Sequence, residues 1–560
     1  MNVGLLNNLG VAFGNSKIEW KNLYNQLGRS TVIDRFSLED TSQVPGLPDE
    51  RSYLLAYESR AIYSSQLSGS HKTKNDRTTY NWTFGYTDLF KNQPDQRRIR
   101  YNMNVFDTMY KAPIANTVDP VNGGGRFYAQ LYEHTYSFNH HFTQKIKIKN
   151  YDFQVQAGNF LEQRRRNYSQ RMLGYTIKSG PLAQVLTRLP IDEIFADSNV
   201  GPKDRFRIDE ITSKSDAYSA KNTMIASYVS LLLPVGPKVK VVGGVRYEHN
   251  TLFIKGFESI DSVEDKQVTK FFLPSVNASY DITDKSLVRV AYGKTLNRPE
   301  FRERAPLFYY DFENRTGTYG ALFDGISKND LKVAEIQNVD VRYEWYPALG
   351  EVLQVGGFYK KFKNPITAIV RRDAVETREV SFINAEEAYT AGVEIEIRKN
   401  LSFADKWFHT KDVFSGFSFI GNATLTKSEM TNRDTFTKNQ ILKTPLTGQS
   451  PYMYNAGLFY QGTNNGFQGS LLYNVFGPRQ VYLGTVENGS IGEMPFNSLD
   501  ITISKIFFKR YSINAGVQNG HLFAYKITQS YNPRFFATGG SDNLIKIWDK
   551  NLGKEIVTLN

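Results

Sequence analysis

The chain has 560 residues, and 68 Lys and Arg against 56 Asp and Glu give it a formal net charge of +12. It contains no cysteine, which excludes disulfide scaffolds, cysteine-ligated metal sites and cysteine nucleophiles. A 14% share of aromatic residues excludes a largely disordered chain. Mean hydropathy is −0.44, and the richest apolar run, 228–235, is far shorter than the ~20 residues of a membrane-spanning helix.

The first ten residues do not contain the basic, apolar and small-residue regions of a signal peptide. This predicts either a cytoplasmic protein or a start that is not the true start of the gene.

Alternation of apolar and polar residues with a period of two dominates the chain from its first third onward. It is clearest at 79–87, 339–345, 389–398 and 499–504. Successive side chains of a strand point to opposite faces of a sheet, so each segment predicts a strand with one apolar and one polar face. We expect about 18 to 20 strands, several with the ~10 residues that cross a bilayer at a tilt. No segment has a sustained helical stripe.

The predicted connections alternate between short and long. Short ones fall at 234–238, 281–285, 346–350 and 508–510. Long ones fall at about 25–50, 112–125, 164–216, 298–330, 427–446 and 477–496. Outer-membrane barrels combine short periplasmic turns with longer extracellular loops. We therefore favour such a barrel over a soluble all-β protein.

Full charges lie on the polar faces of these strands, as at Arg246, Glu248, Glu394, Glu396 and Arg398. In a soluble barrel the apolar face would point inward, but in a membrane barrel it points to lipid and the lumen is polar. Many such strands make a wide barrel that encloses a channel or a plug. Tyr80, Tyr86, Tyr343 and Trp345 are candidates for aromatic girdles, with cross-strand packing as the alternative.

A set of motifs then points to a family. The motifs are FFLPSVNASY at 271–280, VRVAYGKTLNRPEF at 288–301, VRYEWYP at 341–347, GFYKKFKNP at 357–365, FINAEEAYTAGVE at 382–394, LPIDEIF at 189–195 and VGGVRYE at 242–248. Together they resemble the barrel of TonB-dependent receptors of the Bacteroidetes type, over residues 1–519.

The resemblance implies a 22-stranded transmembrane barrel closed by an amino-terminal plug. It also implies a bacterial outer-membrane receptor and transporter, energised by the TonB complex, that takes up a siderophore, cobalamin or glycan. On this resemblance the chain begins inside the barrel. The plug and the coupling segment are therefore expected to be missing, and a fragment inactive alone is expected.

The carboxyl end resembles a different family. A Gly-His pair at 520–521 and a Trp-Asp pair at 548–549 flank a segment typical of one WD40 repeat, whose period is ~40–45 residues. We predict a partial barrel at 1–519 and a short WD40-like β segment at 520–560. The alternative function is a surface binding protein, without transport, that uses this segment for protein interaction.

The residues give no support for an enzyme, a cofactor or a resident metal. His140 and His141 have no third ligand at a telling spacing, and Asp330, Glu335, Asp340 and Glu344 are interpreted as charged lumen carboxylates rather than an acid–base pair. Two glycosylation patterns, at Asn81 and Asn422, fall inside predicted strands.

Two further motifs are candidate binding elements. Gly123–Gly125 is interpreted as a flexible loop that enters a strand at Arg126, because no Lys-Ser/Thr follows it. Gln163–Arg166 is interpreted as a charged loop root facing solvent or lipopolysaccharide. The basic residues are otherwise scattered, so the predicted partners are outer-membrane lipid and lipopolysaccharide, and no nucleic acid. Loops 164–216 and 298–330 are the candidates for solute contact, without any residue assigned.

We predict that residues 520–560 do not fold independently, because a single repeat has no neighbour against which to bury its face. Limited proteolysis should cut between 532 and 560 well before it cuts the barrel strands. Recovery of a protease-resistant fragment that retains Trp548 would contradict this prediction.

Overall fold

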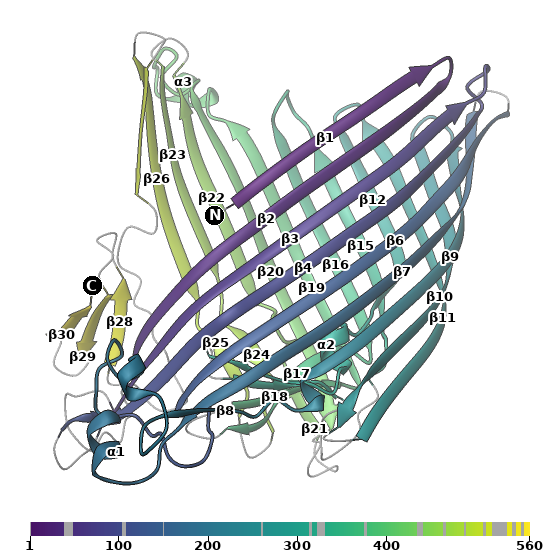
Figure 1. Ribbon diagram of the computed structural model, residues 1–560. Coiled ribbons are helices and arrows are strands. Elements are labelled where there is room, and N and C mark those ends of the chain that lie inside the picture. The colour runs from purple at the N-terminus through teal and green to yellow at the C-terminus, as the bar shows by residue number, and fades with distance from the viewer. Residues whose placement is uncertain are drawn as a thin grey trace.

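The computed structural model describes residues 2–37, 49–103, 108–148, 151–258, 261–312, 316–321, 331–373, 378–433, 441–462, 466–485, 489–507, 511–517, 535–539, 545–549 and 554–559. One antiparallel sheet of 21 strands dominates these residues. It curves into the wall of a wide barrel (Figure 1). The large antiparallel all-β architecture predicted from the sequence is therefore confirmed.

Eighteen strands of the described sheet form one meander in which each strand pairs with the next in that series. They are β1 (Asn2–Phe13), β2 (Ser16–Ser37), β3 (Glu50–Lys72), β4 (Thr78–Met103), β6 (Gly124–Ile148), β7 (Tyr151–Thr176), β9 (Ala217–Val235), β10 (Val239–Glu258), β11 (Asp261–Thr283), β12 (Ser286–Asn297), β15 (Ala334–Trp345), β16 (Val352–Lys363), β19 (Glu387–Asn400), β20 (Phe417–Arg433), β22 (Tyr452–Gln461), β23 (Phe467–Phe476), β26 (Phe496–Phe507) and β27 (Tyr511–Val517).

Short strands and helices occupy the connections. Three side strands complete the main sheet: β5 (Tyr110–Lys111), β8 (Arg207–Glu210) and β21 (Ile441–Thr444). The helices are α1 (Pro181–Leu186), α2 (Phe301–Arg304) and α3 (Phe403–Trp407), with 3₁₀ turns at Asp197–Asn199 and Lys214–Asp216. Within the described residues, no helix is long and apolar enough to cross a membrane.

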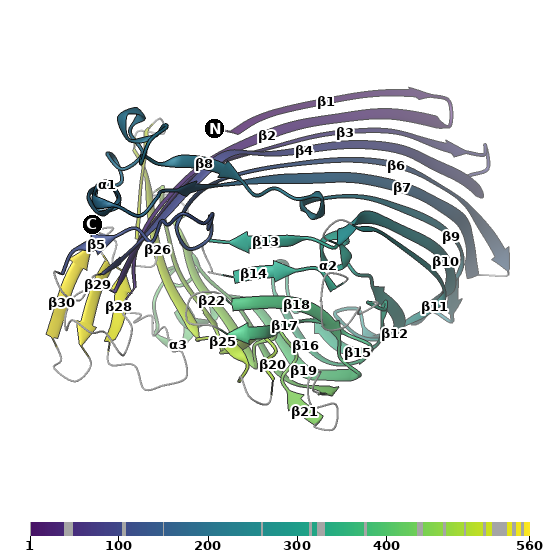
Figure 2. The ribbon, with the colours of Figure 1, turned by 60° about the horizontal axis from the view of Figure 1, so that its bottom comes forward.

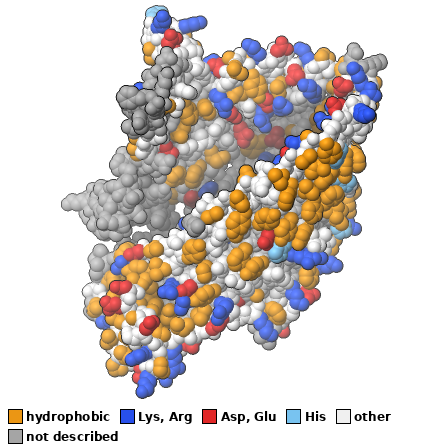
Figure 3. All heavy atoms as spheres, turned by 45° about the horizontal axis from the view of Figure 1, so that its top comes forward, with side chains coloured by type: hydrophobic (Ala, Val, Ile, Leu, Met, Phe, Trp, Pro, Cys, Tyr) orange, Lys and Arg blue, Asp and Glu red, His pale blue; other side chains and the backbone are white. Residues whose placement is uncertain are grey.

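The two faces of the wall differ in chemistry as the alternation predicts. The side chains of Val339, Val341, Tyr343 and Trp345 are exposed on the outer face, whereas Glu344, one residue away, is buried on the inner face. Figure 3 shows hydrophobic side chains gathered on the outer wall and charged ones along the hollow that the wall surrounds. Tyr80, on the same outer face, stacks on Phe142 of the neighbouring strand with ring centroids 4.5 Å apart, which is cross-strand packing.

The short connections lie together at one end of the barrel, which we call the turn end. Residues 236–238, 284–285 and 346–351 connect consecutive strands there. Gly236 has a φ of 77° in the first of these turns, a left-handed conformation that favours glycine. The predicted turn at 508–510 lies outside the described residues.

The long connections lie at the opposite end, which we call the mouth, and several of their predicted limits were wrong. Residues 164–176 belong to β7, and the described part of 25–50 is largely strand. Gln163–Arg166 is thus in the interior of a strand and is not a loop root. β6 begins at Gly124, and Gly125 pairs with Arg98. A Cβ on Gly125 would lie 2.6 Å from Cβ of Pro120, so close packing rather than flexibility requires glycine there.

Three strands of the carboxyl segment form their own antiparallel sheet, β28 (Phe535–Gly539), β29 (Ile545–Asp549) and β30 (Lys554–Leu559). The described pairings do not link this sheet to the main one. A WD40-type repeat at 520–560 remains a prediction, as does the boundary at 519.

The face assignment predicts different costs for the same charge at neighbouring positions. Ile395 is exposed on the outer wall in the middle of β19, and Glu396 belongs to the inner face. Ile395→Arg should lower the free energy of unfolding by about 2–4 kcal/mol in lipid vesicles, because it places a charge in hydrocarbon. Glu396→Arg is the matched control and should cost much less. Equal costs in urea titrations of refolding would contradict the assignment.

Candidate functional site

A small second sheet lies across the mouth inside the wall, and we call it the platform. It contains β13 (Phe308–Asp311), β14 (Thr316–Tyr319), β18 (Arg378–Asn384) and β17 (Ile366–Asp373), in that order. Figure 2 shows these strands enclosed by the curved wall. The hairpin of β24 (Arg479–Tyr482) and β25 (Ile491–Glu493) is joined to it, because Leu483 exchanges backbone hydrogen bonds of 2.8 and 2.9 Å with Val370 and Ala368.

Ion pairs hold the segment before the platform, residues 298–307, against the inner wall. Arg298 lies 2.7 Å from Glu248 of β10. Arg304, which is fully buried, lies 2.6 Å from Asp265 of β11 and donates a hydrogen bond to the Leu331 carbonyl. Because these charges are largely removed from water, loss of one partner costs much more than at an exposed pair.

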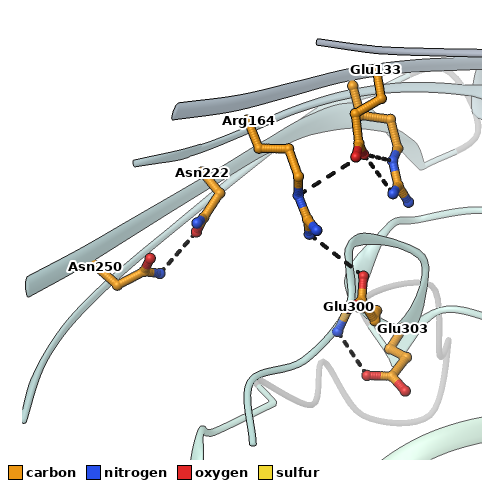
Figure 4. A network of polar contacts seen from close by, with 7 residues as sticks. Glu133, Arg164, Asn222, Asn250, Glu300 and Glu303 are labelled. Atoms are coloured by element: carbon orange, nitrogen blue, oxygen red, sulfur yellow. Dashed lines mark hydrogen bonds and ion pairs between the residues drawn. The ribbon is translucent and has the colours of Figure 1, made fainter. Parts of the chain in front are cut away.

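A third contact joins α2 to β7 (Figure 4). Arg166 pairs with Glu133 at 2.6 Å, and Arg164 reaches Glu300 at 3.5 Å. Both guanidinium groups lie over the ring of Phe301, at 4.4 and 5.0 Å from its centroid. Phe301 is only 1% exposed, so it combines apolar burial with two cation–π contacts. Burial also raises the pKa of the Glu303 carboxyl, which accepts a hydrogen bond from the Glu300 backbone N–H.

The β13 edge of the platform contacts the strands β2, β4 and β7 as well. Arg98 lies over the Tyr310 ring at 5.0 Å, Gln170 donates to the Phe308 carbonyl at 2.8 Å, and Arg35 donates to the Phe312 carbonyl at 3.1 Å. Buried Leu54, Tyr310 and Phe312 form an apolar cluster there. Across the platform, Ile369 of β17 and Ile383 of β18 are buried with Ala388 of β19 and Met430 of β20, so the platform is anchored on two sides.

A cavity of about 110 Å³ lies between the platform and the inner wall. Apolar and amide side chains line it, together with three cations and three tyrosines. The cations and tyrosines are Lys91, Arg166, Arg302, Tyr168, Tyr218 and Tyr309. Lys91 and Arg166 are already paired with Glu58 and Glu133 at 2.7 and 2.6 Å.

Arg302 differs from the other two cations of the cavity. Its guanidinium lies 4.3 Å from the centroid of the Tyr309 ring, and no carboxylate of the described residues lies within ion-pairing distance. Burial raises the pKa of the Tyr309 phenol, against the effect of Arg302, so this hydroxyl stays a neutral donor at physiological pH. The cavity therefore presents one uncompensated cation beside phenol groups, an arrangement suited to an anionic group.

A protein-family model described as "TonB dependent receptor-like, beta-barrel" matches residues 8–519. The chain belongs to this family. No sequence among curated proteins matches the receptor chain significantly.

Solved structures similar to the receptor chain share its fold at low sequence identity. The siderophore receptor PiuA from Acinetobacter baumannii has 12% identity and a TM-score of 0.54, with 92% of this chain and 75% of that chain covered. The ferric citrate transporter FecA in its unliganded form has 10% identity and a TM-score of 0.51, with 92% and 73% covered. At these identities the similarity concerns the fold alone.

The two predicted solute-contact loops lie on different faces of the receptor wall. The described part of 298–330 lies in the lumen, whereas 177–216 packs on the outside against Tyr53, Ile99 and Tyr175. These three side chains share the outer face. A cavity of about 440 Å³ lies under this outer excursion. Solute contact by these two loops stays a prediction.

The other singled-out residues do not assemble into a site. His140 and His141 are adjacent in a strand and contact Asn159 and Asn81. No group of three potential metal ligands occurs in the described part of the chain. Glu335 lies 2.6 Å from Lys294 and, by the strand period, faces away from Asp340 and Glu344. Asp330 lies outside the described residues.

Sequence reasoning did not find Arg302, Phe301 or the tyrosine-lined cavity. The predicted 298–330 connection contains Phe301 and Arg302, but the walls of the cavity come from strands more than 80 residues away in sequence. The one available signal was the dense run of Arg and Glu at 298–304.

Phe301→Ala should release the platform from the wall. Removal of a buried aromatic side chain costs about 3–5 kcal/mol, and the effect should be local, because the wall strands keep their ladder. Backbone amides of 308–319 should exchange hydrogen faster, measured by mass spectrometry. Phe403→Ala in α3, where the ring is 37% exposed, is the control and should leave this exchange unchanged. Equal protection in both variants would contradict the anchoring role.

Proposed function

We propose that the chain acts as an outer-membrane receptor barrel that captures a large, scarce solute of the siderophore, cobalamin or glycan class at the mouth. Family membership supports outer-membrane uptake coupled to the TonB complex, and the predicted lipid and lipopolysaccharide contacts accord with such a location. In this proposal the solute meets the platform first, and its passage requires the lumen beneath to open.

Within these classes we propose an anionic solute. The observation that carries this choice is Arg302, whose guanidinium faces a tyrosine-lined cavity without a carboxylate partner in the described residues. A carboxylate or catecholate group of a ferric siderophore has the charge and the acceptor oxygens to bind there. A neutral glycan could accept a hydrogen bond from this exposed guanidinium but would gain no ion pair with it.

Binding by purified, refolded receptor chain tests this proposal. Isothermal titration would compare ferric citrate, a ferric catecholate siderophore, cobalamin and a neutral oligosaccharide. We expect an anionic ferric complex to bind, and Arg302→Gln to weaken it about 10- to 100-fold, because a hydrogen bond to a charged group is lost. Arg342→Gln, an equal change of charge on the inner face near the turn end, is the matched control.

A different pattern of binding would overturn the anionic assignment. If cobalamin or the oligosaccharide binds and Arg302→Gln has no effect, the solute belongs to another of the three classes. If no compound of the panel binds to either the unaltered chain or the Arg302→Gln variant, the proposal that the cavity captures the solute is wrong.

We also propose the division into a barrel at 1–519 and a WD40-like segment at 520–560. The separate sheet of β28–β30 supports it. The alternative of a non-transport surface binding protein predicts that deletion of 520–560 abolishes partner binding while solute binding persists.

A further inference from the structure

Four cations lie on the outer face of β7, β9 and β11: Arg165, Lys221, Lys266 and Lys270. All four are exposed. Arg165 lies directly opposite Lys221 in the ladder, Lys221 lies opposite Phe253, and Phe253 lies opposite Lys266. Paired residues of a ladder point to the same face, so Arg165, Lys221 and Lys266 lie in one line across the strands, with Phe253 between the last two. Lys270 lies on the same face four residues further along β11, and we call the four cations the outer cationic patch.

The patch lies next to the apolar band of the wall. On β9 the outward side chains from Ile225 to Val235 are mostly apolar and exposed, and this segment has the ~9–11 residues that a tilted strand needs to cross a bilayer. Lys221 lies four residues before Ile225, or about 13 Å along the strand and roughly 9 Å along the membrane normal at a ~45° tilt. With long side chains able to reach back, this is the depth of lipid headgroups.

The charges of the patch are not compensated within the described residues. Like charges directly opposite each other destabilise a sheet, yet no carboxylate in the described part of the chain pairs with any of the four. Neighbouring cations on the same face do have partners, since Lys255 lies 2.9 Å from Glu264. On the inner face, Arg164 and Arg166 are also paired. The unpaired cations are therefore gathered where an external anion would meet them.

We propose that the outer cationic patch binds the phosphate groups of the glycolipid headgroups of the outer leaflet, the lipopolysaccharide. A row of cations at headgroup depth matches phosphates that are held in a plane, and the apolar band beneath matches the acyl chains of the same molecules. A free phosphate would gain only the first of these contacts. This inference rests on the proposed outer-membrane location, but not on transport or on the identity of the solute.

The test uses the full chain in neutral detergent with bisphosphorylated lipid A and with a dephosphorylated lipid A of the same acylation. The triple variant Arg165→Gln, Lys221→Gln, Lys266→Gln removes most of the patch. Each basic residue near an anionic surface adds a similar attraction, and this variant removes three of them. Lipid A binding should therefore weaken on the order of a hundredfold. The matched control, Lys74→Gln, Lys238→Gln, Lys285→Gln, removes the same charge from exposed positions at the turn end and should bind like the unaltered chain.

Several outcomes would overturn the proposal. They are equal weakening in the two triple variants, equal affinity for phosphorylated and dephosphorylated lipid A, and inorganic phosphate that competes as well as lipid A does. If the triple variant does not refold, Lys221→Gln alone should weaken binding about fivefold, and no effect would overturn the proposal. Solute binding by the same preparations separates the two ideas: lipid A binding without any solute binding counts only against the proposed function.

Discussion

Each wall strand has one face on the outside of the barrel and one face toward the lumen. This constraint determines where each kind of side chain lies. The ladder pairs backbone groups between neighbouring strands, so few of them need water along the described wall. Side chains then alternate between the outer and inner faces with no freedom to exchange. Val339, Val341 and Tyr343 are therefore outside, while Glu344 and Glu248 are buried inside and bonded to Arg289 and Arg298.

The inner charges in turn make the platform possible. The segment 298–307 is short, and α2 has only four residues, so the burial of Phe301 and Leu307 is not its only anchor. It is held because the inner wall offers Glu248 and Asp265 as fixed partners for Arg298 and Arg304. The tyrosine-lined cavity results from this anchoring, since its cations and tyrosines come from both the wall and the anchored segment.

The elements that could be predicted from the sequence are those governed by local periodicity. Alternation at 79–87 and 389–398 identified strands and their faces, and the short turns at 234–238 and 281–285 were located correctly. The failures occurred where tertiary structure overrides local signals. Three consecutive arginines at 164–166 suggested a solvated loop, but β7 tolerates them because it continues beyond the apolar band and pairs two of them inward.

The sequence also could not predict on which side of the wall a long connection packs. The excursions at 177–216 and 298–321 both mix apolar and charged residues, so neither composition distinguishes the lumen from the outer rim. Packing decides: Phe206 and Ile194 are buried with Ile99 and Tyr175 on the outer face, while Phe301 and Leu307 are buried with Leu252 and Ile254 on the inner face.

Because 177–216 packs on the outside of the barrel, a macromolecule can bind it without entering the lumen. An excursion that packs beside the barrel offers a macromolecule a binding surface that does not overlap the lumen. Such a ligand would leave the mouth uncovered, whereas one bound to the platform would cover it. Substitutions on the surface of the outer excursion can therefore change what binds there without altering the platform or its cavity.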